Sequence, residues 1–210
     1  MQCEWNQITS SAYLSLLELN LNSFPINPKK FKFNGVKIAS FQKYSEKTGL
    51  SIEEITCNHE LDDAFVLKGL RKGVTLILYN KNKYNSRVKH SLLHEVGHIK
   101  LDHKKHGSQE EIEAHFFASQ MNAPNALIRE ISRRGYRVDA LVLKQNFELS
   151  DESAAKKQDY LKRHGFNHCN DFDDAILNQF STWLNQNFPL KARQVDDDYF
   201  YEMEREREGW

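Results

Sequence analysis

The sequence RVKHSLLHEVGHIK, residues 87–100, contains the pattern His-Glu-x-x-His and has the periodicity of a helix. Apolar residues recur in it at spacings of three and four, as on the buried face of a helix: Val88, Leu92, Val96 and Ile99. Leu93 and Leu101 widen this stripe. We therefore predict a central helix that is packed along much of its circumference.

The pattern itself consists of His94, Glu95 and His98. Residues four apart on a helix lie nearly above one another, because each residue turns the helix by about 100°. Two imidazoles placed in this way can bind one zinc ion from a single rigid helix. Glu95 lies one position further round, close enough to accept a proton from a water on that metal. The alternative is a pair of surface histidines beside an acid, since the pattern fixes only three positions.

The flanking residues predict how this helix begins, packs and ends. Gly97 costs about 1 kcal/mol relative to alanine inside a helix, which indicates that another segment approaches its backbone closely. We expect Ser86 to cap the start of the helix. Lys104, Lys105 and Gly107 are typical of a helix end.

A zinc site needs a third protein ligand. A metzincin would have glycine and histidine at the positions of Leu101 and Lys104, so that pattern is excluded. His103 is five residues past His98, well over 100° further round a continuous helix. A carboxylate from EEIEAHFFA, residues 110–118, is available after a tight turn at residues 106–108 and an antiparallel return. A His2Glu set would leave the fourth position open for water, as in a catalytic zinc site.

HEVGHIKLDH followed by EEIEAHFFASQMNAP resembles the ImmA/IrrE metallopeptidases, with the motifs HE-x-GH-x-x-L-x-H and then E-x-x-A-N-x-F-A. The resemblance covers about residues 10 to 163. It implies one Zn²⁺ per chain, with His94 and His98 as ligands and Glu95 as general base. It also implies Glu111 as third ligand, in preference to Glu110 and Glu113, because the acid of the family stands three residues before the alanine, here Ala114.

One position departs from the family pattern. His115 stands where the family usually has asparagine or aspartate. One turn from Glu111, it could be a hydrogen-bond partner of a ligand, an additional ligand, or merely tolerated. A second donor to the oxyanion is also needed, and the sequence offers candidates without ranking them: Tyr79, Tyr84, His115 and Tyr136.

The fold implied is α+β: a mostly helical, zincin-like metallopeptidase core with a small β-sheet ahead of the active-site helix, followed by a C-terminal helical region that resembles a helix-turn-helix. We divide the chain into a peptidase domain (1–135), the helix-turn-helix-like subdomain (136–165), and a C-terminal helix with an acidic tail (166–210). The tail from 196 to 210 is expected to be mobile, or helical only when docked.

Local patterns predict the individual elements. Strands are expected at 36–39, 64–67 and 74–79, with the last two joined across a turn at Gly69 and Gly73. Residues 74–79 are our candidate to hold an extended substrate by β-augmentation; alternatively, this strand only covers the helix. Helical segments are expected elsewhere, with Ser150 as an N-cap: 8–21, 125–134, 138–145, 151–163 and 175–188. Residues 41–46 and 52–55 are expected to be short helical or loop segments.

The composition of the chain limits the classes of function that we expect. Lys plus Arg and Asp plus Glu number 29 each, so no net positive field draws the protein to nucleic acid. The helix at 151–163 mixes acids with its lysines, so direct DNA binding is not expected. Three widely spaced cysteines indicate reduced thiols and a cytoplasmic protein. No apolar stretch of about 20 residues is present, so we expect no membrane partner.

The predicted function is a zinc-dependent endopeptidase that cleaves a protein inside the cell. By resemblance, its substrate is a helix-turn-helix repressor of a phage or mobile element, whose cleavage relieves repression. The alternative is a non-catalytic regulatory or toxin–antitoxin component that contains zinc and binds an Xre-type DNA-binding protein. The presence of Glu95 favours catalysis, because a structural zinc site needs no base.

Overall fold

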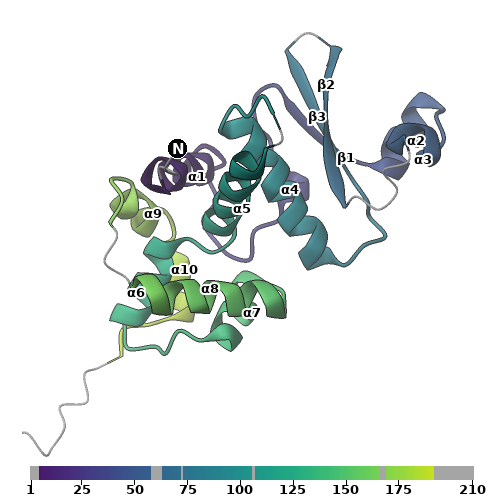
Figure 1. Cartoon of the computed structure of the whole chain (residues 1–210). Helices are drawn as coiled ribbons and strands as arrows, with labels where there is room; N and C mark the ends of the chain where they lie inside the picture. The colour runs from purple at the N-terminus through teal and green to yellow at the C-terminus, as the bar shows by residue number, and fades with distance from the viewer. Residues whose placement is uncertain (1–4, 58–62, 72, 106, 166–168, 192–210) are drawn as a thin grey trace, which may run out of the picture.

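The computed structural model describes residues 5–57, 63–71, 73–105, 107–165 and 169–191 (Figure 1). Its fold is α+β, as predicted, with a three-stranded sheet ahead of the central helix. The strands are β1 (Val36–Ser40), β2 (Ala64–Arg71) and β3 (Val74–Tyr79). The helices are α1 (Trp5–Glu18), the 3-10 turn η1 (Pro28–Lys30), α2 (Phe41–Thr48), α3 (Ile52–Thr56), α4 (Asn85–Lys100), α5 (Ser108–Asn122), α6 (Asn125–Arg133), α7 (Ala140–Phe147), α8 (Asp151–His164), α9 (Asp173–Gln179) and α10 (Ser181–Asn187).

The sheet has the order β1-β3-β2. β3 pairs in parallel with β1, with Ile77 opposite Ile38, and antiparallel with β2. The prediction that residues 74–79 bind an extended substrate is therefore wrong, because both edges of β3 are already hydrogen-bonded. Strand order depends on long-range pairing, which the local pattern does not contain. Gly69 also lies inside β2, whereas Gly73 has the left-handed φ of 73° that suits the turn.

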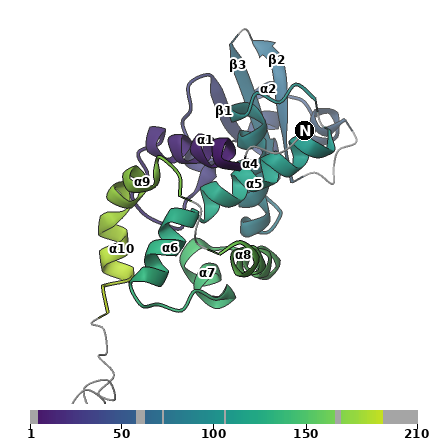
Figure 2. The ribbon, with the colours of Figure 1, turned by 60° about the vertical axis from the view of Figure 1, so that its left-hand side comes forward.

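The alternation of β3 gives the sheet two apolar faces. Leu76 and Leu78 pack with Phe41 and Ile55 in a small cluster beneath α2 and α3. Ile77 points the other way, into the main apolar cluster that surrounds α4. Figure 1 shows α2 and α3 on one side of the sheet and α4 on the other, and Figure 2 shows α1 beside α5.

α4 is the predicted central helix, and Val88, Leu92, Leu93 and Val96 are all buried. Its ends differ from the prediction. The N-cap is Tyr84, without a side-chain bond, so Ser86 lies inside the first turn. The helix ends at Lys100, before Lys104, because Asp102 adopts a left-handed backbone conformation.

The close approach predicted at Gly97 is confirmed. A Cβ atom there would lie 3.1 Å from Phe117 Cδ1 and 3.2 Å from the Cα and carbonyl oxygen of Ala114. These two residues belong to α5, so glycine allows α4 and α5 to pack backbone against side chain. This close packing brings the polar faces of the two helices together.

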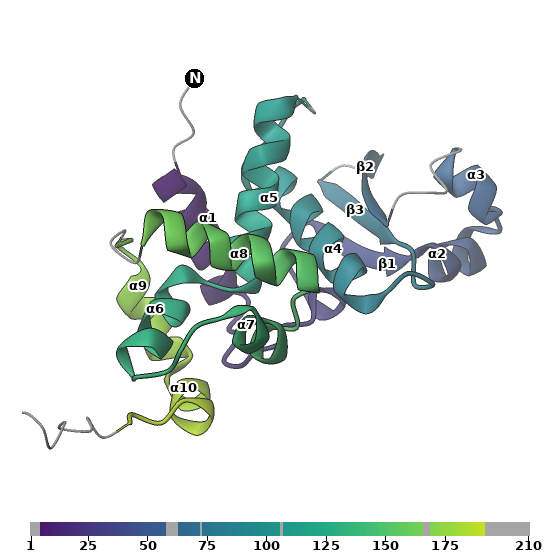
Figure 3. The ribbon, with the colours of Figure 1, turned by 60° about the horizontal axis from the view of Figure 1, so that its bottom comes forward.

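Within its described residues, the C-terminal half adds five helices, α6 to α10, and Figure 3 shows α7 beside α8. Ser150 caps α8 as predicted, with its hydroxyl accepting from the Ser153 N–H at 3.1 Å. The single helix predicted at 175–188 is wrong: α9 and α10 meet at Phe180. The rings of Phe180 and Trp183 pack against Phe24, and the Trp183 N–H donates to the Phe24 carbonyl, so tertiary packing sets this break.

The main apolar cluster includes residues from all three predicted segments, such as Leu92, Phe147 and Trp183. Our division at 135/136 and 165/166 stays a prediction about which parts fold on their own. The predicted acidic tail at 196–210 lies outside the described residues. Within the described part of the chain, no helix has the length and apolar composition needed to cross a bilayer.

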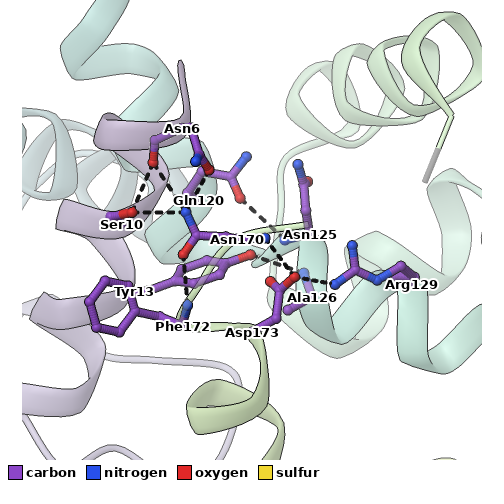
Figure 4. A network of polar contacts seen from close by, with 10 residues as sticks. All are labelled: Asn6, Ser10, Tyr13, Gln120, Asn125, Ala126, Arg129, Asn170, Phe172 and Asp173. Atoms are coloured by element: carbon purple, nitrogen blue, oxygen red, sulfur yellow. Dashed lines mark hydrogen bonds and ion pairs between the residues drawn. The ribbon is translucent and has the colours of Figure 1, made fainter. Parts of the chain in front are cut away.

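A polar network fastens the C-terminal helices to α1 and α6 (Figure 4). The Asn170 amide donates to Asn6 and to Ser10 Oγ at 2.8 Å, and the Asn170 N–H donates to Asp173 Oδ2 at 2.8 Å. Asp173 also accepts from the buried Arg129 guanidinium. Segments distant in sequence are thus joined by donors matched to acceptors.

Candidate metal centre

Five polar side chains line the contact between α4 and α5. His90, His94 and His98 are four residues apart on α4, and Glu111 and His115 are four apart on α5. His90 contacts His115 and His98 contacts Glu111, so the two helices run antiparallel. The antiparallel return predicted after residues 106–108 therefore places the two polar rows face to face.

Three of these side chains converge on one point. His94 Nε2 lies 3.0 Å from His98 Nε2 and 3.1 Å from Glu111 Oε2, and His98 Nε2 lies 3.4 Å from Glu111 Oε1. Ligand atoms around a tetrahedral zinc with bonds near 2.05 Å are separated by about 3.3 Å. The separations of this His2Glu set therefore fit a tetrahedral ion.

His115 is the fourth donor near this point. It offers a ligand atom that lies with those of His94 and Glu111 in a group whose atoms are all within 4.8 Å of one another. Its ring centroid is 4.3 Å from that of His94, and its Nδ1 lies 3.2 Å from His90 Nε2. This geometry suits a further ligand, or a side chain beside the ligands that faces the substrate.

Burial favours the neutral form of two histidines of α4. It lowers the pKa of His94 to about 4, and repulsion from His115 and His98 adds to this effect, while Glu111 opposes it. Burial and the neighbouring His115 lower the pKa of His90 to about 4 as well. His94 is therefore neutral at pH 7, the form in which an imidazole binds metal.

Behind His98 lies a chain of hydrogen bonds. His98 Nδ1 is 2.9 Å from His103 Nδ1, and His103 Nε2 is 3.1 Å from Glu113 Oε2. Glu113 also accepts from the Gln109 amide at 2.7 Å. The carboxylate requires a proton on His103 Nε2, so His103 Nδ1 accepts from His98 Nδ1–H. This tautomer directs a lone pair of His98 Nε2 at the convergent point.

His103 can reach His98 because the chain leaves the helix. The His103 N–H donates to the His98 carbonyl at 3.0 Å, just past the left-handed Asp102. The angular argument that placed His103 away from His98 assumed a continuous helix, and it is wrong for that reason. His94 lacks such support among the described residues: its Nδ1 is buried and has no hydrogen-bond partner.

The remaining predicted site residues lie as follows. Glu95 is half-buried on α4, directly after His94. Tyr79 ends β3, where its ring faces Lys29 Nζ at 5.5 Å. Tyr84 is 85% exposed, and Tyr136 donates its hydroxyl to the Pro189 carbonyl beyond α10. Of the four oxyanion candidates, the structure brings His115 into the histidine group.

Two cavities adjoin His115. One, of about 860 Å³, extends along α1, and the other, of about 550 Å³, lies against α8. His115, Phe116 and Tyr160 line both, and the Phe116 and Tyr160 rings are 6.0 Å apart. A substrate thus has room on two sides of the histidine group.

The model of the IrrE N-terminal-like domain, a peptidase family, matches residues 46–158, just over half of the chain. The chain belongs to this family of metallopeptidases. The matched segment includes all five residues of the α4–α5 row. No curated protein and no solved structure matches the chain.

Several residues around the centre of this metallopeptidase escaped the sequence interpretation. His90 had a detectable signal, because it precedes His94 by one helical turn on the same face. His103 was visible as the last residue of HEVGHIKLDH, but its contact depends on how α4 ends. Tyr160 and Lys157 come from α8, and their place beside α5 depends on tertiary packing alone.

Proposed function

We propose that this metallopeptidase is a zinc-dependent endopeptidase that hydrolyses a peptide bond in a protein substrate. The observation that carries the proposal is the convergence of His94 Nε2, His98 Nε2 and the Glu111 carboxylate at separations of 3.0 to 3.4 Å. Two imidazoles and one carboxylate are a donor set that zinc prefers.

His94, His98 and Glu111 would hold one zinc ion per chain. When bound, the ion would supply Lewis acidity, which acidifies water and polarises a peptide carbonyl. Glu113, acting through His103, would hold the His98 ring in the orientation and tautomer that the ligand set needs. The prediction of Glu111 over Glu113 is supported by this division: Glu111 faces His94, and Glu113 faces His103.

Glu95 is assigned as general base. Its carboxylate would accept a proton from the attacking water and deliver it to the leaving amine. His115 is our preferred second donor to the developing negative charge, because it stands in the histidine group and lines both cavities. Tyr79 is the weaker candidate, since its ring is engaged by Lys29.

The proposed substrate is a helix-turn-helix repressor of a phage or mobile element, on the strength of the family resemblance. β2 is the antiparallel edge strand of the sheet and packs on α4, so its outer edge is where an extended substrate would add. Direct DNA binding by α7 and α8 is not proposed, because Lys144, Lys156 and Lys162 each lie beside an acid. Cys57 and Cys169 are free and exposed, which supports a reducing, cytoplasmic location.

The test is incubation of the zinc-loaded protein with a helix-turn-helix repressor encoded beside it, with and without chelator. We expect a discrete cut that disappears with chelator and returns when zinc is added in excess. A repressor that stays intact in every tube overturns the proposed substrate.

The variant Glu95→Gln separates catalysis from binding. It keeps the length and most contacts of the side chain but cannot accept the proton, so cleavage should fall by about 10²- to 10⁴-fold. Zinc content, measured by atomic absorption, should be unchanged. Full biological function in this variant would instead support the non-catalytic, partner-binding alternative.

A further inference from the structure

Lys157, on α8, is a buried cation, and packing of the fold alone does not require a charge at this position. Its exposed fraction is 5%, and its Nζ donates to Ser119 Oγ at 3.3 Å. The Tyr160 ring is an aromatic neighbour, with its centroid 6.0 Å from Lys157 Nζ. Among the described residues, no carboxylate lies within 4.0 Å of Lys157 Nζ. Burial of a charge without a counter-ion is costly, so a function is the more economical explanation.

The position of Lys157 is on the wall of the 550 Å³ cavity that adjoins the candidate metal centre. His90 and His115 form the side of this cavity toward α4 and α5, and Ser119 and Asn122 continue it along α5. The same cavity is thus lined by Lys157 and by His115, which stands beside the candidate metal centre.

The acid on the wall of the cavity is paired with a different lysine. Lys156 and Glu152 at its edge pair with each other, with Nζ and Oε1 2.5 Å apart and both side chains 76% exposed. Glu152, which lines this cavity, is thus engaged by Lys156 and not by Lys157. On α5, Asn122 is buried and its Oδ1 has no hydrogen-bond donor among the described residues.

This pattern specifies a ligand. An ammonium group with one hydrogen bond has two further protons to donate, which suits a carboxylate. A peptide that bears a carboxylate supplies this group.

We propose that the cavity between α5 and α8 is a substrate subsite that binds a peptide carboxylate, and that Lys157 is the residue that recognises it. The carboxylate is that of an aspartate or glutamate side chain near the scissile bond, or that of a C-terminus. This inference deepens the proposed peptidase function and rests on it for the identity of the ligand as a peptide. Lys157 selects the substrate and takes no part in bond cleavage.

The solvation of Lys157 agrees with this role. Burial lowers its pKa to about 7, so Lys157 holds its proton only weakly when no anion lies beside it. A carboxylate that enters would stabilise the charged form and complete the ion pair. Selectivity for acids would then arise from a cation whose burial cost is offset only when the correct group is bound.

Peptide binding tests the inference independently of turnover. The zinc-loaded Glu95→Gln protein would be titrated calorimetrically with acetyl-Ala-Glu-Ala-amide, with its Gln counterpart, and with acetyl-Ala-Gln-Ala bearing a free carboxyl terminus. We expect the Glu peptide or the free-terminus peptide to bind roughly 10- to 100-fold more tightly than the neutral one, as for a charged hydrogen bond. The two charged peptides distinguish a side-chain from a terminal carboxylate.

The added substitution Lys157→Met should abolish that difference, because methionine fills similar volume without the charge. Lys144→Met is the matched control: it removes the same charge from α7, outside the cavity, and should keep the preference. If Lys157→Met does not fold, Asn122→Asp places a carboxylate inside the cavity and should also remove the preference. Equal binding of all three peptides by the Glu95→Gln protein overturns the inference.

Cleavage of a mixed peptide library, with cut sites mapped by mass spectrometry, separates this inference from the proposed function. Enrichment of acidic residues near the cut, lost in Lys157→Met, supports both. Chelator-sensitive cleavage without acidic enrichment overturns the subsite and leaves the peptidase intact. Absence of all cleavage, together with Lys157-dependent binding of a charged peptide, overturns the peptidase function but retains the carboxylate site.

Discussion

Two polar clusters in this molecule have different chemistry. In the network around Asn170 and Asp173, the Asn170 amide and the Arg129 guanidinium donate to acceptors, and the segments it joins are α1, α6 and α9 (Figure 4). In the group around His94, His98 and Glu111, the atoms that converge are two imidazole Nε2 atoms and a carboxylate. The first cluster connects segments of the fold, whereas the second brings together groups that can bind a metal ion.

This difference separates a structural cluster from a functional one. Buried donors and acceptors that satisfy each other stabilise a fold and need nothing further. Imidazole and carboxylate groups that converge at ligand spacing can bind a metal ion as well. Substitutions in the two clusters should therefore change different quantities: the free energy of unfolding in one, and metal affinity in the other.

The largest effect is expected for Asp173→Ala in the structural network. The substitution removes a carboxylate from the buried Arg129 guanidinium and an acceptor from the Asn170 N–H. Loss of one partner of a buried ion pair typically costs about 3–5 kcal/mol. Urea denaturation should show this loss, while zinc affinity of the folded protein should stay within twofold. A large loss of zinc affinity in folded Asp173→Ala would end the distinction between the clusters.

Glu111→Ala should produce the converse result. It removes the only carboxylate of the proposed ligand set, which must weaken zinc by more than the 10- to 100-fold typical of residues behind the ligands. The half-exposed position of Glu111 predicts little change in the free energy of unfolding of the metal-free protein. Competition with a chromogenic chelator measures the affinity. Glu110→Ala is the control, and zinc affinity equal in all three proteins would exclude Glu111 as a ligand.

His103→Asn tests the hydrogen bonds behind the candidate ligands. Asparagine can still accept from His98, but it breaks the link from His98 to the Glu113 carboxylate. We expect zinc affinity to fall by about 10- to 100-fold. Glu113→Gln should weaken zinc in the same direction, and the double variant should lose little more than the worse single one, because both act through one chain of bonds. Fully additive losses would show that the two residues act separately.

Much of this centre was predictable because its signals are local. The three- and four-residue period of α4 predicted a buried helix, Gly97 predicted the approach of α5, and the motif residues predicted which side chains would meet. The α+β class followed from the same patterns and from the family resemblance.

The failures have a common physical cause in long-range structure. The central place of β3 depends on its pairing with β1 across the intervening helices, and the break at Phe180 depends on Phe24. His103 reaches His98 only because Asp102 turns the chain out of the helix. Lys157 lines a cavity that forms only where α8 packs against α5. None of these relations is contained in a local window of sequence.

The smallest effect concerns two buried lysines, which repeat the contrast between the clusters. Lys89 donates to the Phe147 carbonyl at 2.7 Å and lies 3.6 Å from Glu148 Oε2, whereas Lys157 bonds to one hydroxyl. Burial lowers the pKa of Lys89 to about 8 and that of Lys157 to about 7. An unfolded lysine keeps its proton up to about pH 10.5.

Between the folded pKa and pH 10.5, the unfolded chain therefore binds a proton that the native protein lacks, and stability rises with pH. Each lysine adds a slope of at most about 1.4 kcal/mol per pH unit, from about pH 8 for Lys89 and from about pH 7 for Lys157. Urea denaturation of wild type, Lys89→Met and Lys157→Met at pH 7, 8, 9 and 10 isolates each share by difference. Lys157→Met should be at least as stable as wild type at pH 7, because it removes a charge without a counter-ion, while Lys89→Met should be less stable. If Lys157→Met is instead less stable than wild type at pH 7, and Lys89→Met is not, then Lys157 stabilises the fold and a ligand-binding role does not explain its burial.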